Sequence, residues 1–383
     1  MDTEPFPHVR VSGGPRERGR SYGEQARERV RRSIEAYDEV FAHYAGWRWV
    51  DVREEAGRYV GPIEAFEPRY AEEMRGVAEG AGVTFEDVVG VNVRTEVMLA
   101  AKARAAAGAD PRARTDGCSA FAVVPPRSAN GHTLIGQNWD WLLHSFDTVV
   151  VLEAEQEEGP DFVTVVEAGL LAKTGMNSSG IGLVTNALVT DRDTGEPAVP
   201  YHVVLRAILD AETLPDACAA MQRSPRSSSA NYLIATVDGM AVDVEATPGD
   251  FSRLLLSFPT DGVLLHTNHF VSPRFDDTDV SLWVMPDSPF RFARLTDFVG
   301  SHAGPLSLND FRSFLADHAN HPSGVCCHPD ERLERLDRGS TVASVLMDLD
   351  ERRMWVADGH PCTSPYRELD YRSFLSRRPA AVG

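Results

Sequence analysis

The sequence predicts an α+β fold in which antiparallel sheets are stacked on one another and covered by helices. Residues 16–99 carry apolar side chains at the three- and four-residue steps of amphipathic helices. From Cys118 onward, short apolar runs alternate with Gly, Asn and Asp turn dipeptides, which is typical of antiparallel hairpins. Helical stretches lie among these strands, and helices that cover a sheet bury the apolar face of both.

The first part of the chain is predicted to be helical. One amphipathic helix is expected over residues 16–45, a second over about 63–80 and a third over about 84–99. Thr84, followed by two acidic residues, is typical of a helix start. Residues 101–115 are rich in Ala and Arg without an amphipathic pattern, so we expect an exposed connector there.

The rest of the chain is predicted to be mostly strands. The turn dipeptides Asn130-Gly131 and Asp238-Gly239 lie between apolar runs and predict hairpins. The expected strands cover residues 118–124, 133–139, 149–155, 162–167, 181–185, 232–237, 241–246, 263–267, 341–349 and 352–357. The helices expected among them cover about 200–211, 214–223, 288–300 and 307–317.

Composition excludes several classes of protein. With 43% hydrophobic residues in 383, the chain can bury a sizeable core, and its net charge of −19 argues against nucleic-acid and anionic-membrane partners. We see neither a secretion signal nor a membrane-length apolar run, and five cysteines without disulfide-like spacing fit a reducing cytoplasm. The cations are almost all arginine, with lysine only at Lys102 and Lys173, and this bias predicts nothing about mechanism.

The tetrapeptide Asp116-Gly117-Cys118-Ser119 stands where the connector meets the first predicted strand. It predicts a nucleophile exposed by self-cleavage between Gly117 and Cys118, because the new terminus would carry a thiol and an α-amine on one residue. An α-amine titrates near ~7.7–8.0 and can take the thiol's proton without a separate histidine. Glycine before the bond leaves room for the attacking sulfur. On these two residues alone, a buried structural cysteine is the alternative.

A series of short motifs follows in a fixed order along the chain: Gly13–Gln25, Glu73–Gly80, Asn92–Glu96, Asp116–Cys118, Gly136–Asp140, Asn177–Gly182 and His266–His269. In this order they resemble the family of acyl-coenzyme A:6-aminopenicillanic acid acyltransferase, which includes carcinine-hydrolase-like amidases, within the N-terminal-nucleophile hydrolases. The resemblance implies a four-layer αββα sandwich. It also implies a mainly helical segment over residues 1–117 that stays associated with a catalytic segment over 118–383 after cleavage.

The resemblance further implies site residues and an activity. Cys118 is the nucleophile, Asn268 matches the family's oxyanion asparagine, and Asp140 matches the aspartate that steadies the new α-amine. The implied reaction cleaves or transfers acyl groups at C–N bonds of small acylated amines, amino acids, peptides or β-lactams through an acyl-thioester. An acyl-CoA or an amine acceptor is a further possible partner, and no cofactor or metal is required.

Other residues have weaker assignments. Ser229 corresponds to a serine that the family needs for processing, although an ordinary loop explains it equally. Asn177 and Asn186 are candidates for hydrogen bonds to substrate, and turn formation explains them equally. The penicillin-forming relative has a basic residue that aligns near Cys326–Pro329, where this chain has cysteine. That departure puts recognition of an anionic acceptor or acyl carrier in doubt.

Three alternative functions stay open at this point. The bile-acid and penicillin V amidase branch resembles this family in fold, but its members begin close to the nucleophile, whereas 117 residues precede it here. A zinc-dependent hydrolase would use His266 and His269 with Cys326 or Cys327, although adjacent cysteines are poor chelators and no standard zinc motif is present. A processed but inactive scaffold would only bind acyl ligands.

Overall fold

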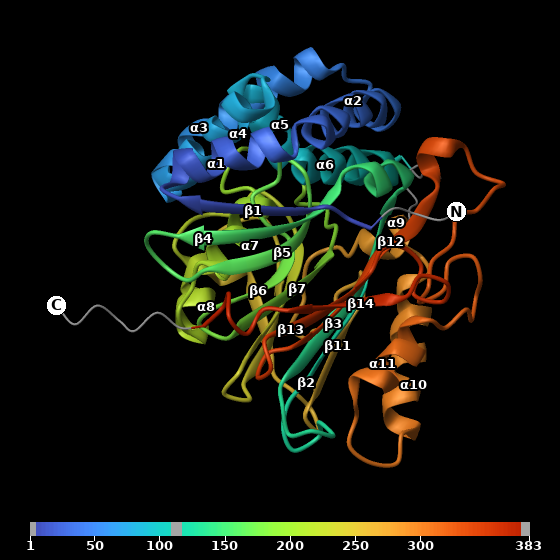
Figure 1. Ribbon diagram of the computed structural model, residues 1–383. Coiled ribbons are helices and arrows are strands. Elements are labelled where there is room, and N and C mark those ends of the chain that lie inside the picture. The colour runs from blue at the N-terminus through green and yellow to red at the C-terminus, as the bar shows by residue number, and fades with distance from the viewer. Residues whose placement is uncertain (1–4, 109–116, 377–383) are drawn as a thin grey trace.

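The computed structural model describes residues 5–108 and 117–376, which form four layers: helices, an eight-stranded sheet, a six-stranded sheet and helices again (Figure 1). The order of strands is β1-β4-β5-β6-β7-β8-β9-β10 in the larger sheet and β11-β2-β3-β12-β13-β14 in the smaller one. Neighbouring strands are antiparallel except β1 and β4, which are parallel. The predicted α+β class and the αββα arrangement are confirmed.

The strands of the larger sheet are β1 (His8–Gly13), β4 (Val149–Gln156), β5 (Phe162–Glu167), β6 (Thr174–Asn177), β7 (Ile181–Ala187), β8 (Ala230–Thr236), β9 (Ala241–Ala246) and β10 (Leu254–Ser257). The strands of the smaller sheet are β2 (Ser119–Val123), β3 (Leu134–Leu142), β11 (Val263–His266), β12 (Gly339–Asp348), β13 (Arg353–Ala357) and β14 (Tyr366–Asp370).

The helices before the first strand of the smaller sheet are α1 (Pro15–Gln25), α2 (Arg27–Tyr44), α3 (Trp49–Phe66), α4 (Pro68–Ala81), α5 (Phe85–Asn92) and α6 (Arg94–Ala107). The later helices are α7 (Tyr201–Leu209), α8 (Leu214–Gln222), α9 (Ser281–Val284), α10 (Ser288–Ser301) and α11 (Leu308–Leu315), with short 3-10 turns η2 (Leu143–Asp147), η3 (Phe251–Arg253) and η4 (Arg335–Asp337).

The alternation of side chains along each strand builds three apolar cores between the layers. On β4, Val150 and Leu152 face the N-terminal helices, whereas Val149 and Val151 face the smaller sheet. On β2, Phe121 and its alternate neighbours pack against α10 and α11, on the outer side of the smaller sheet (Figure 1). The opposite face of β2, which begins at the nucleophile candidate, therefore points into the space between the two sheets.

Helices α1 and α4 are in close backbone contact through glycine. A Cβ atom on Gly19 or Gly23 would overlap backbone atoms of α4, and one on Gly76 or Gly80 would overlap backbone atoms of α1. The same contact buries the Arg18–Glu73 ion pair, whose N–O distance is 2.5 Å. The first two family-like motifs of the sequence therefore build a helix pair that lies in the layer above the larger sheet.

The structure differs from the sequence prediction in several places. The helix expected over residues 16–45 is interrupted at Ala26, and the expected connector begins as helix, since α6 continues to Ala107. Residues 109–116 of that connector lie outside the described residues. Strands β1, β6, β10 and β14 were not predicted, because each is short and β1 pairs with a strand far along the chain. Helices α3 and α9 were not predicted either. Within the described residues, none of the helices is long and apolar enough to cross a membrane.

Candidate active site

The side chain of Cys118 lies buried at the start of β2, between the two sheets. Its Sγ donates a weak hydrogen bond to the backbone oxygen of Asp140, at 3.9 Å. A small cavity of about 30 Å³ lies beside the sulfur. Its lining includes Gly117, Cys118, Asp140 and Asn268, together with residues of α6. The structure thus brings together the three residues that the sequence proposed for catalysis.

The amide group of Asn268 is held in one orientation at the end of β11. Its Nδ2 donates to the Ala187 oxygen at 2.9 Å, and its Oδ1 accepts from Arg291 Nη2 at 3.0 Å. An asparagine NH₂ has two hydrogens, so one remains to be donated into the cavity. Gly117 lies directly against this group, because a Cβ there would overlap the Asn268 amide and the Met285 sulfur.

Sequence reasoning missed Arg291, which lies on α10 and joins the site from the outer layer. Its guanidinium donates to the Cys118 oxygen at 2.6 Å and to Ser119 Oγ at 3.1 Å, and its charge is balanced by Asp287 at 2.5 Å. The side chain is almost fully buried. Arg291 therefore fixes both the nucleophile's backbone and the Asn268 amide. An arginine in an amphipathic helix gives no local signal of such a role.

The carboxylate of Asp140 is fixed by the neighbouring strand. Thr341, opposite Asp140 in the β3–β12 register, donates from Oγ1 to Asp140 Oδ1 at 2.6 Å. The same Thr341 oxygen accepts from the Cys327 backbone N–H at 2.9 Å. The position of the carboxylate beside the nucleophile thus depends on the segment that leads into β12.

Both lysines of the chain line the cavity, a feature that the sequence gave no reason to expect. The Lys173 ammonium lies 4.6 Å from the centre of the Trp139 ring, and burial lowers the pKa of Lys173 to about 8. Burial also raises the pKa of the Cys118 thiol, and the nearby Lys173 charge partly offsets this increase. Of the nearby cations, Lys173 contributes most to favouring a thiolate at Cys118, and Arg291 acts in the same direction.

Replacing Lys173 with methionine is expected to raise the pH at which Cys118 becomes reactive, because a nearby positive charge lowers a thiol pKa. Asp140→Asn should lower the pH at which Cys118 becomes reactive, since the Asp140 carboxylate raises the pKa of the Cys118 thiol. The measurement is the rate of Cys118 alkylation by iodoacetamide as a function of pH, followed by peptide mass. Lys173→Arg keeps the charge and should keep the wild-type profile. An unchanged profile in Lys173→Met would contradict the assignment.

The cavity wall formed by α6 is tied to the larger sheet by buried charges. Arg94 pairs with Glu167 at 2.6 Å, and its guanidinium lies 4.7 Å from the Trp141 ring. Although burial opposes ionisation, Arg94 holds the pKa of Glu167 well below its usual range. Glu96 Oε1 accepts from the backbone N–H of Tyr201 at 2.7 Å. The third family-like motif therefore positions the helix that closes the cavity.

The weaker candidates lie outside the cavity lining. Ser229 donates to Asp193 at 2.6 Å. Asn177 bonds backbone groups only, donating to two carbonyls and accepting from two N–H groups, so it organises a turn. Asn186 accepts from Asn231 between the sheets, at 3.2 Å. All three side chains are held by hydrogen bonds within the protein, and their suggested parts in processing and substrate binding stay predictions.

The zinc site proposed from His266, His269, Cys326 and Cys327 is not assembled, so that alternative is wrong. His266 Nδ1 faces the Thr267 oxygen at 2.7 Å and its Nε2 faces Glu245 at 2.9 Å, so both ring nitrogens serve as donors and neither has a lone pair for a metal. Burial alone would lower the pKa of His266, but nearby carboxylates outweigh burial and raise it to about 9.

Replacing His266 with glutamine is expected to lower the free energy of unfolding by about 3–5 kcal/mol at pH 7, because it leaves buried carboxylates without their cation. The folded-state pKa of about 9 lies above the ~6.5 of an ordinary imidazole. The stabilisation is therefore complete below pH ~6.5 and is lost as pH rises through about 9. Urea unfolding at pH 7 and pH 10 measures the difference between wild type and variant.

The matched control for that experiment is His132→Gln. His132 pairs with Asp348 at 2.9 Å, but its side chain is 28% exposed, so the loss should be about 1 kcal/mol or less. Equal losses in the two variants, or a loss in His266→Gln that persists at pH 10, would contradict the buried ion pair.

Comparisons with known proteins show which family this chain resembles. Residues 127–362 match the family described as acyl-coenzyme A:6-aminopenicillanic acid acyl-transferase. Over 357 residues, the chain is 25% identical to the acyl-coenzyme A:6-aminopenicillanic-acid-acyltransferase 40 kDa form of Emericella nidulans, which covers 92% of this chain and 93% of that protein.

Two solved structures are also similar. A mutant of the conjugated bile acid hydrolase from Clostridium perfringens is 13% identical, with a TM-score of 0.44, and the match covers 68% of this chain and 95% of the hydrolase chain. Penicillin V acylase from Agrobacterium tumefaciens is 14% identical, with a TM-score of 0.42, and the match covers 68% of this chain and 88% of the acylase chain.

Proposed function

The chain belongs to the acyl-coenzyme A:6-aminopenicillanic acid acyl-transferase family, and from this membership we propose that it is a self-processing enzyme with an N-terminal cysteine nucleophile. It cleaves or transfers acyl groups at amide bonds through a thioester on Cys118. The observation that carries the proposal is the placement of Gly117 against the Asn268 amide, with the Cys118 sulfur in the same cavity. The residue before the nucleophile thus occupies the place of an acyl group.

Processing would use the groups already in place. The Cys118 sulfur attacks the Gly117 carbonyl carbon, the C–N bond breaks, and the nitrogen takes the proton released by the thiol. A thioester between Gly117 and Cys118 results. Water then hydrolyses this thioester, giving a carboxylate on Gly117 and leaving Cys118 with a free thiol and a free α-amine.

Turnover would repeat the same steps on a substrate. The α-amine takes the thiol proton, the sulfur attacks the amide carbonyl, and the spare Asn268 hydrogen stabilises the oxyanion. The amine leaves with a proton, and water or an acceptor amine then takes the acyl group from sulfur. Asp140 holds the α-ammonium, and Lys173 stabilises the thiolate.

The proposed substrates are small acylated amines, amino acids, peptides or β-lactams. The name of the Emericella nidulans relative points to an acyl-CoA and an aminopenicillanic acid for that protein. In this chain, Trp139 and Trp141 and the cations Lys102 and Lys173 line the cavity. Aromatic rings suit an apolar acyl group, and ammonium groups suit a carboxylate on the same molecule.

Trapping the acyl-enzyme tests this function directly. The processed protein is incubated with a panel of N-acyl amino acids, penicillins and acyl-CoA esters, quenched in acid and digested. We expect a substrate-dependent acyl adduct on the peptide that begins at Cys118, and hydroxylamine should remove it because it is a thioester. Cys218→Ser should give the same adduct, since that half-buried cysteine lies on α8. Turnover by any substrate without an adduct at Cys118, and without inhibition by alkylation there, would reject the proposal.

A further inference from the structure

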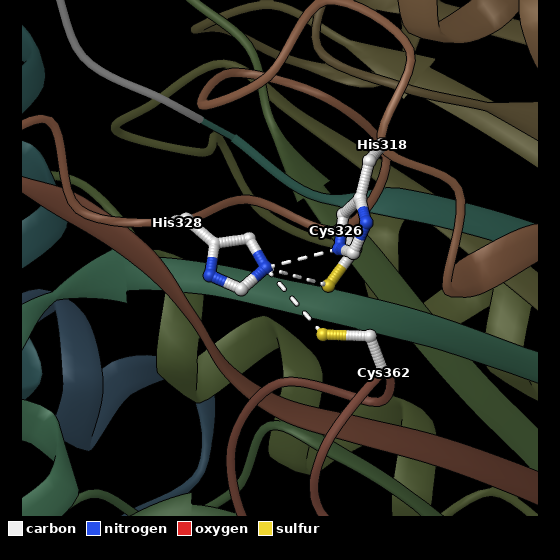
Figure 2. Close-up of side chains that lie close together, drawn as sticks. All are labelled: His318, Cys326, His328 and Cys362. Atoms are coloured by element: carbon white, nitrogen blue, oxygen red, sulfur yellow. Dashed lines mark hydrogen bonds between the residues drawn. The ribbon is translucent and has the colours of Figure 1, made fainter.

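Four side chains that could ligate a metal converge outside the Cys118 cavity: His318, Cys326, His328 and Cys362 (Figure 2). The first three belong to the segment between α11 and β12, and Cys362 belongs to the turn between β13 and β14. One nitrogen or sulfur from each residue lies within 4.8 Å of all the others. In Figure 2 both imidazole rings and both sulfur atoms point toward one common position.

The spacing of these atoms matches a tetrahedral zinc ion. His328 Nε2 lies 3.1 Å from His318 Nε2, 3.5 Å from Cys326 Sγ and 3.5 Å from Cys362 Sγ. With Zn–N bonds of about 2.0–2.1 Å and Zn–S bonds of about 2.3 Å, tetrahedral geometry places two nitrogens about 3.3 Å apart, and a nitrogen and a sulfur about 3.5 Å apart. The three distances from His328 are thus close to those of a tetrahedral site, and the other pairs of ligand atoms lie within 4.8 Å.

We propose that His318, Cys326, His328 and Cys362 bind a structural zinc ion. Two thiolates and two imidazoles in tetrahedral geometry favour zinc over magnesium or calcium, which require oxygen ligands. Four protein ligands leave no position for water or substrate, so the ion is structural rather than catalytic. This site differs from the one expected from sequence: it contains neither His266 nor His269, and it uses Cys326 without Cys327.

The zinc ion would hold a long connection between α11 and β12 in place. Residues 316–338 connect α11 to β12, and η4 is the one regular element of this span. Connections longer than about 12–15 residues without secondary structure are uncommon unless something holds them. Three ligands on this segment and a fourth on the turn after β13 would fasten the segment to the edge of the smaller sheet.

The zinc site would also position a residue of the candidate active site. Cys327 lies between two ligands, and its backbone N–H donates to Thr341 Oγ1 at 2.9 Å, while its oxygen accepts from the Thr341 N–H at 3.0 Å. Thr341 in turn donates to Asp140 at 2.6 Å. Ordering of the ligand segment is thereby transmitted to the carboxylate beside Cys118 through two hydrogen bonds.

The test measures metal content and stability, so its result does not depend on the proposed enzymatic function. The full chain, produced without an affinity tag in zinc-supplemented medium and dialysed, should contain about one zinc ion per chain by plasma mass spectrometry. Cobalt substitution should give thiolate-to-cobalt charge-transfer absorption. A strong chelator should lower the melting temperature of the wild type.

Variants identify the ligands. Cys362→Ala and His318→Ala should lose the zinc, the charge-transfer band and the sensitivity to chelator. His318 is exposed, so its replacement removes a ligand without leaving a cavity in the core. His321→Ala is the matched control, because this imidazole lies 5.2 Å from the His328 ring without belonging to the four ligands. Cys218→Ser is the thiol control, and both controls should bind zinc as the wild type does.

Two outcomes would overturn the proposal. One is a zinc content that does not depend on the four ligands, either because the wild type holds no zinc after loading or because Cys362→Ala binds as much zinc as the wild type. The other is an intact mass, under non-reducing conditions, that is lower by two hydrogens, with a Cys326–Cys362 crosslink in the peptide map. That crosslink would show that the two sulfurs form a disulfide instead of binding a metal.

Discussion

Replacing Cys118 with alanine is expected to leave one unbroken chain without activity, whereas the wild type separates into fragments 1–117 and 118–383 under denaturing conditions. Both losses are expected from the same sulfur, because in the proposed mechanism it attacks the Gly117 carbonyl in processing and the substrate carbonyl in turnover. Loss of a nucleophile costs on the order of 10⁶-fold in turnover. Intact-mass measurement gives the fragments, and the activity assay gives the rate.

Two variants make this experiment specific. Gly117→Ala retains the thiol but places a Cβ where the Asn268 amide and the Met285 sulfur lie, so processing should be slowed severely. Cys218→Ser should be processed and active, because that thiol lies on α8. A wild type that stays whole over a full time course and is nevertheless active would remove self-cleavage from the mechanism. Activity in Cys118→Ala would show that Cys118 is not the nucleophile.

Replacing Asn268 with alanine is expected to lower kcat by about 10²–10³-fold with far less change in KM, which is the usual loss of one oxyanion donor. The amide is already oriented, with Oδ1 on Arg291 and one Nδ2 hydrogen on the Ala187 oxygen. Because the proposed mechanism uses Asn268 in processing as well, rates must be normalised to the amount of alkylatable N-terminal Cys118.

A substitution at Arg291 tests whether the orientation of the Asn268 amide matters for turnover. Arg291→Lys retains a positive charge but loses the planar guanidinium that bonds the Cys118 oxygen and the Asn268 amide together. We expect kcat to fall while KM and the pH profile of alkylation change little. Normal turnover in the processed Asn268→Ala variant would transfer the oxyanion role to another donor.

Local patterns in the sequence predicted stacked sheets covered by helices, and the family resemblance added the four-layer arrangement and three members of the site. The alternation along β2 and β3 was visible, and Cys118, Asp140 and Asn268 each lie in a short motif with a family counterpart. The structure brings these three together around one cavity, while their catalytic roles stay predictions.

The missed features depend on contacts between distant parts of the chain. Strand β1 pairs with β4 across more than a hundred residues. Lys173 follows an apolar run, and its significance comes only from the thiol that the fold places near it. The zinc ligands His318 and Cys362 are far apart in sequence and fit no standard spacing. Local patterns carry no information about such pairs.

The burial of both lysines has a consequence for the protein's chemical reactivity. Lys102 is 3% exposed and Lys173 is 5% exposed, so every lysine of the chain is withdrawn from solvent. Amine-directed labels, which modify most proteins at surface lysines, should react with the folded protein only at α-amino termini. Arginine resists acylation where lysine accepts it. A protein that handles activated acyl groups would thus be protected from acylating its own surface.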